Sequence, residues 1–90
     1  MKIPKKLKIG GHEVSVVFHQ IKDENGSFEP RTNTITIDPT LAKSQQEATF
    51  IHEVLHAINT SIDEIPLGHA FMDGLAEQLY QVLSENKLLK

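Results

Sequence analysis

Apolar and polar residues alternate along the first half of the chain, in short runs separated by turn-forming residues. A period of two is typical of strands with one buried face. We predict strands over Lys5–Ile9, Glu13–Ile21 and Thr34–Asp38, and a further short strand that begins at Phe28. Asn25-Gly26 is a hairpin-turn signal, and Thr32-Asn33 is a second turn candidate. The first half therefore predicts a small, mostly antiparallel sheet of three to four strands.

The second half changes to a helical pattern, with apolar residues three and four positions apart. Ser44–Glu47 has the spacing of a capping box just before an apolar run, so a helix should begin there and continue to about Asn59. The polar, turn-rich segment that follows should end it. A second helix should start at Pro66 or Leu67, because proline suits a first helical position, and run to about Asn86.

Ninety residues are enough for one domain with a small core. The connection between the two predicted helices is long enough to bring the second one back against the first. We therefore predict a single domain over residues 1–90 with an α+β fold, in which the sheet packs on two antiparallel helices.

The first predicted helix contains an H-E-x-x-H motif, His52-Glu53-Val54-Leu55-His56. Two histidines four apart lie on one helix face, roughly 5–6 Å apart, and from there both imidazoles can reach one tetrahedral Zn²⁺. Glu53 can then act on a zinc-activated water instead of binding the metal. The alternative is a helix that carries the pattern by chance, but the long apolar side of this helix indicates that the motif is on a buried element.

A catalytic zinc usually has three protein ligands, and the second predicted helix offers His69, Asp73 and Glu77, each one turn apart. On a wheel of about 100° per residue, its apolar residues form one arc: Phe71, Met72, Leu75, Ala76, Leu79, Val82 and Leu83. Asp73 and His69 border this arc and Glu77 lies further out, which favours the first two as ligands. Asp73 would also complete a set of two histidines and a carboxylate, as in hydrolytic zinc sites. His69 is alternatively a residue that orients a ligand or stabilises an oxyanion.

Three segments in this order resemble the small zincin metallopeptidases of phages and bacteria: Ile35–Asp38, Thr49–Ile58 and Asp73–Leu83. The closest resemblance is to the minimal gluzincins of the ImmA/IrrE-like group, and it covers most of the chain. In that group a later helix supplies a glutamate as third ligand, and Asp73 occupies this position here. Aspartate is shorter by one methylene, so either the helices approach more closely, or Glu77 or His69 takes over as the third ligand, or the metal is bound weakly. The resemblance also implies that the strand Thr34–Asp38 lines the cleft and pairs with an extended peptide.

Composition narrows these expectations. The chain has no cysteine, so a disulfide scaffold is excluded and a metal must be held by histidine and carboxylate. The net charge of −3 argues against nucleic acid as a partner. The basic start lacks the apolar segment of a signal peptide, and no apolar run has the length of a membrane span. We therefore expect a soluble, cytoplasmic protein. His12 and His19 lie outside any motif and are expected at the surface.

Together these features predict a zinc metallopeptidase that acts on a peptide or protein substrate. Glu53 would be the general base towards a zinc-activated water and would then pass the proton to the leaving amine. One alternative is a zinc-binding interaction or regulatory module without catalytic activity, in which both His69 and Asp73 would close the metal site. The other alternative is an interaction protein that binds no metal.

Overall fold

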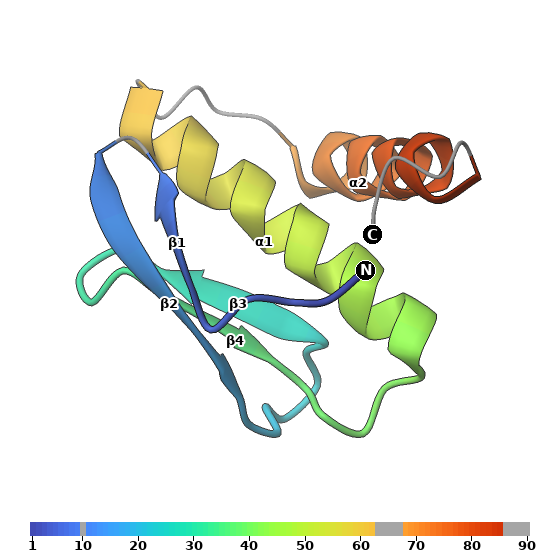
Figure 1. Ribbon diagram of the computed structural model, residues 1–90, viewed down its shortest axis with the longest axis horizontal. Helices are drawn as coiled ribbons and strands as arrows, with labels where there is room; N and C mark the ends of the chain where they lie inside the picture. Colours follow the sequence, from blue (N-terminus) through green and yellow to red (C-terminus); the bar gives the residue numbers. More distant parts are fainter. Residues whose placement is uncertain (10, 63–67, 86–90) are drawn as a thin grey trace.

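The computed structural model describes residues 1–9, 11–62 and 68–85, without the side chains of residues 61, 62, 69 and 82–85. The chain forms four strands followed by two helices (Figure 1): β1 (Lys6–Ile9), β2 (His12–Phe18), β3 (Gly26–Glu29), β4 (Thr34–Ile37), α1 (Lys43–Ile62) and α2 (His69–Glu85). The predicted α+β class is confirmed. His12 and His19 are exposed, as expected.

The strands form one mixed sheet in the order β1-β2-β4-β3. β1 pairs with β2 and β3 pairs with β4 in antiparallel fashion, but β2 and β4 in the middle run parallel, with Val16 opposite Ile35. The predicted antiparallel arrangement is therefore corrected at the central pair. Ile35 and Ile37 are fully buried, and a strand that carries such residues is best covered when it lies inside the sheet with a neighbour on each side.

The Asn25-Gly26 dipeptide does not form the predicted hairpin turn. β2 ends at Phe18, and the chain turns at the Ile21–Glu24 bridge, where Asp23 has a left-handed conformation with φ 62°. This turn belongs to the connection that leads from β2 past β4 to the edge of the sheet, where β3 begins. The hairpin forms instead between β3 and β4, where Asn33 of the second predicted turn has φ 49°.

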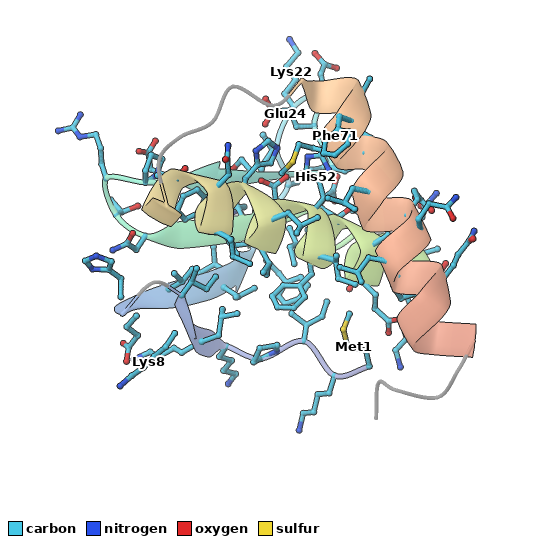
Figure 2. The ribbon with its side chains drawn as sticks, turned by 90° about the horizontal axis from the view of Figure 1, so that it is seen from above. Met1, Lys8, Lys22, Glu24, His52 and Phe71 are labelled. Atoms are coloured by element: carbon cyan, nitrogen blue, oxygen red, sulfur yellow. The ribbon has the colours of Figure 1, made fainter. Side chains whose placement is uncertain are left out.

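The two helices and the sheet form successive layers (Figure 1). α1 packs on β1, β3 and β4, and α2 packs on the other side of α1 and crosses it (Figure 2). The core lies between the inner face of the sheet and the helices, and it consists of Ile9, Val14, Val16, Ile35, Ile37, Phe50, Ile51, Ala57 and Ala76. Within the described part of the chain, no helix is long and apolar enough to cross a membrane.

α1 extends beyond both of its predicted ends. It begins at Lys43 and continues to Ile62, past Asn59. Helical structure therefore continues into the polar segment that was expected to end it, because the first residues of that segment are compatible with a further helical turn. α2 begins at His69 and ends at Glu85, and the predicted boundary residues 66, 67 and 86 lie outside the described residues.

Glu47 joins the two helices instead of capping the first one. Its residue is only 6% exposed. One carboxylate oxygen accepts a hydrogen bond of 2.5 Å from the hydroxyl of Tyr80 on α2, and the other lies 3.5 Å from the terminal ammonium of Met1. A buried carboxylate needs such partners to offset the loss of water. The capping-box prediction is therefore corrected, because tertiary contacts take up this side chain.

Candidate metal centre

The two histidines of the motif lie on a side of α1 that borders the core without entering it. Phe50, Ile51 and Ala57 are buried in the core, whereas His52 and His56 line a cleft on an adjacent side of the same helix. The helical repeat of about 100° per residue produces this separation, because residues four apart remain neighbours while the intervening ones turn away. One segment of α1 thus serves both the core and the cleft.

The imidazole rings of His52 and His56 converge. Their Nε2 atoms are 2.9 Å apart, and the rings meet edge to face with centroids 4.6 Å apart. The side chain of His52 is 16% exposed, so the cleft can be reached from solvent. Two nitrogens that each lie about 2.0–2.1 Å from one tetrahedral zinc are about 3.3 Å apart. A small rotation of the rings would therefore open the pair enough to admit a cation.

Asp73 reaches the histidine pair from α2. Its Oδ1 lies 3.0 Å from Nδ1 of His52, which is the ring nitrogen that does not face His56, and its side chain is 68% exposed. If Nδ1 carries the proton and donates a hydrogen bond to this carboxylate, Nε2 keeps the lone pair that a metal ligand needs. In the described geometry Asp73 therefore orients His52, and its role as the third ligand stays a prediction.

The other candidate ligands lie one turn to either side of Asp73. Glu77 is exposed and lines the same cleft. The side chain of His69, where α2 begins, lies outside the described residues. Among the described residues, no group of three or more histidine, aspartate or glutamate side chains is arranged to hold a metal ion. The structure thus brings two predicted ligands and Asp73 together, and the choice of third ligand stays open.

α2 presents Asp73 to α1 because of how the helix is rotated. Met72 and Ala76 are 1% and 2% exposed, but Phe71 and Leu75 are 58% and 40% exposed. The predicted buried arc is therefore wrong at the end that contains Phe71. Among the described elements α2 packs on α1 alone, so the strip that it buries is narrower than its apolar arc. The buried strip lies on the side of the arc next to Asp73, which brings this carboxylate to the cleft.

Glu53 is the buried carboxylate of the site. The residue is 6% exposed, and its Oε2 lies 3.8 Å from Nε2 of His52. Burial, together with the nearby negative charges of Glu24 and Asp73, raises the pKa of Glu53 to about 7. A carboxyl group with a pKa near neutrality can both accept and donate a proton at physiological pH. Glu53 therefore has the properties of a general base beside the histidine pair.

The burial of Glu53 depends on the close approach of β3 to α1. A Cβ atom added to Gly26 would lie 2.6 Å from Cγ2 of Thr49, 2.8 Å from the carbonyl oxygen of Thr36 and 3.6 Å from Cγ of Glu53. Only glycine leaves room for the strand and the helix to meet here. Sequence reasoning assigned Gly26 to a turn and missed this role. A glycine next to a strand pattern was the available signal, because it often marks a close backbone approach.

A cleft of about 880 Å³ contains the histidine pair and Glu53. One wall is formed by the segment 23–28 and Pro30, and the other walls are formed by α1 and α2. The strand Thr34–Asp38 was expected to pair with an extended peptide. It corresponds to β4, which lies between β2 and β3 and has no free edge. That expectation is therefore corrected: β1 and β3 are the edge strands of the described sheet, and of these two β3 borders the cleft.

Comparison of the chain with protein-family models, with curated proteins and with solved structures gave no match.

Proposed function

We propose that this protein is a zinc-dependent metallopeptidase that hydrolyses peptide bonds in the cytoplasm. The observation that carries the proposal is the arrangement around His52, whose Nε2 lies 2.9 Å from Nε2 of His56 and 3.8 Å from a carboxylate oxygen of the buried Glu53. All three residues line one open cleft. The resemblance of the sequence to the minimal gluzincins points to the same chemistry.

The donor set of the cleft fits zinc. Imidazole nitrogens and carboxylate oxygens are common zinc ligands, and the chain has no thiolate to compete with them. His52 and His56 would hold the ion through Nε2, and Asp73, His69 or Glu77 would supply the third ligand. A fourth position would then be open to water or substrate. When bound, zinc supplies a Lewis acid that polarises the scissile carbonyl and lowers the pKa of water.

Glu53 would move the proton. With a pKa of about 7 it is partly ionised at neutral pH, and a cation at the neighbouring histidines would favour the ionised form further. The carboxylate accepts a proton from the attacking water and then donates it to the amine nitrogen as the carbon–nitrogen bond breaks. Asp73 holds His52 through Nδ1 and keeps the ring from turning away from the cleft.

An extended peptide would bind along the free edge of β3. The backbone groups of an edge strand can pair with an added strand whatever the side chains are. β3 is four residues long, from Gly26 to Glu29. It forms part of one wall of the cleft, and its residue Gly26 lies close to Glu53 of α1. A peptide paired there would be held by its main chain while its scissile bond lies over the histidines.

The test is the cleavage of a broad peptide library by zinc-loaded wild type and by Glu53→Gln, with products identified by mass spectrometry. Glutamine keeps the size of the side chain but cannot accept the proton, so cleavage should fall by about 10²–10⁴-fold while zinc content and the circular dichroism spectrum are unchanged. Glu13→Gln, at an exposed position of β2, is the matched control and should cleave as wild type does.

Two outcomes would contradict the proposal. Cleavage that survives in the Glu53 variant would indicate a contaminating protease or a different base. No cleavage by zinc-loaded wild type would leave a zinc-binding interaction module as the better description of the protein.

A further inference from the structure

The charged side chains of the cleft, apart from its two histidines, are all acidic. Five carboxylates line it, whereas none of the described lysine or arginine residues does. Four of the five are exposed and form a group that we call the acidic rim: Asp23, Glu24, Asp73 and Glu77. The chain as a whole has nine lysines and arginines against twelve aspartates and glutamates. Among the described residues, the positive charge of the lysines and the arginine therefore lies outside this cleft.

The acidic rim has two sides. The tight turn before β3 places Asp23 and Glu24 in one wall of the cleft, and α2 presents Asp73 and Glu77, one turn apart, in another. In Figure 2, Lys22 points outward at the periphery, while Glu24 lies between it and His52. A ligand that lies over the histidine pair would therefore have carboxylates on both of its sides.

A metal would not cancel the charge of the acidic rim. A divalent cation at the histidines would neutralise only two of the four rim charges, so the metal-loaded cleft would stay negative. Like charges arranged around a concave surface focus the field within it and attract ligands of opposite charge. Each rim carboxylate is exposed and partly screened, so each contributes only modestly to the binding of a cationic ligand. Selection therefore comes from several carboxylates that act on one ligand.

We propose that the cleft selects peptide segments that carry a lysine or arginine close to the bond lying over His52 and His56. This inference rests on the proposed peptidase function and adds the class of substrate. Long basic side chains can extend from a peptide on the β3 edge to either side of the acidic rim. The same carboxylates would repel an acidic peptide, which gives the selection a negative as well as a positive component.

The experiment measures peptide binding and does not depend on cleavage. Zinc-loaded Glu53→Gln protein is immobilised and incubated with a mixture of random seven-residue peptides, and the retained peptides are sequenced by mass spectrometry. Lysine and arginine should be enriched over aspartate and glutamate by about five- to tenfold, since each exposed charge pair contributes about two- to fivefold. Adding about 0.5 M salt, roughly three times the physiological ionic strength, should reduce the enrichment because salt screens exposed charges.

Rim variants made in the same Glu53→Gln protein then test the origin of the preference. Adding Asp23→Asn with Glu24→Gln, or adding Glu77→Gln, should each lower the enrichment by about two- to fivefold. Adding Glu13→Gln removes an exposed glutamate that does not line the cleft and should change nothing. No retained peptide, no enrichment, or enrichment that persists in the rim variants would each overturn the inference. Cleavage by wild type without a basic preference would overturn it while leaving the peptidase proposal intact.

Discussion

Replacing Glu53 by glutamine should stabilise the metal-free protein at pH 8 and leave its stability nearly unchanged at pH 4. The side chain of Glu53 is 8% exposed, and burial is the main reason that its pKa is raised from 4.5 to about 7. Ionising this group in the folded protein is therefore costly. Glutamine has nearly the same shape and carries no charge at any pH, so it removes the cost without leaving a cavity.

The magnitude follows from the pKa. A rise from 4.5 to about 7 corresponds to about 3 kcal/mol of folding free energy. Below pH 4.5 the carboxyl is protonated in both the folded and the unfolded chain, so there is no penalty. As the pH rises from 4.5 to 7, the unfolded chain ionises first and is favoured. The wild type therefore loses stability across this window, relative to the glutamine variant, and the difference is complete above pH 7.

Urea denaturation followed by circular dichroism, in the presence of a chelator, measures this difference. The free energy of unfolding of Glu53→Gln should exceed that of wild type by about 2–3 kcal/mol at pH 8 and by less than about 0.5 kcal/mol at pH 4. Titrating groups that do not interact with Glu53 contribute equally to both proteins and cancel in the comparison. Glu13→Gln should stay within about 0.5 kcal/mol of wild type at both pH values, as a surface substitution does. Equal stability of wild type and Glu53→Gln at pH 8 would refute the reasoning.

Three further predictions concern the metal and the packing of β3. Asp73→Ala should lower zinc affinity by about tenfold or more, as the loss of a ligand or of its orienting partner does, and by more than Glu77→Ala does. The reverse ranking would indicate that Glu77 is the ligand, and small equal effects would favour His69. Zinc at a hundredfold excess over its Kd should add about 2.7 kcal/mol to the free energy of unfolding, or about 10–20 °C to the melting temperature of a domain of this size. An unchanged Tm after verified zinc removal would show that packing alone holds the helices together. Gly26→Ala should lower the free energy of unfolding by about 1–3 kcal/mol, because the new Cβ would overlap atoms of α1 and β4. At Gly74 nothing lies within 4 Å of such a Cβ, so Gly74→Ala should stabilise the protein by about 0.5–1 kcal/mol. A harmless change at position 26 would contradict the close approach of β3 to α1.

The part of the site that the sequence predicts is the part that depends on local geometry. His52 and His56 are one helical turn apart, so any helix through the motif brings their side chains together, and apolar periodicity is enough to identify that helix. Asp73 was also predicted to point between the helices, because it borders the apolar arc of α2. The contact at Nδ1 of His52 could not be predicted, since it depends on the distance and rotation of one helix against the other.

Long-range pairing accounts for most of what the sequence left open. The parallel contact between β2 and β4 joins segments separated by a whole connection, and alternation within each strand does not say which strands are neighbours. Asn25-Gly26 has the composition of a turn, yet Gly26 is needed for packing against α1. The exposure of Phe71 likewise depends on how many elements are available to cover α2, which is a property of the fold and not of the helix.

The measurement that tests the account most directly is the zinc content of the purified protein, determined by elemental analysis after incubation with zinc and removal of the excess. The wild type should retain close to one zinc ion per chain, and His56→Ala should retain almost none, because a site of this kind needs both histidines. His12→Ala, which removes an exposed histidine of β2, should retain as much as wild type. A wild type without bound zinc, or full zinc retention by His56→Ala, would contradict the central claim.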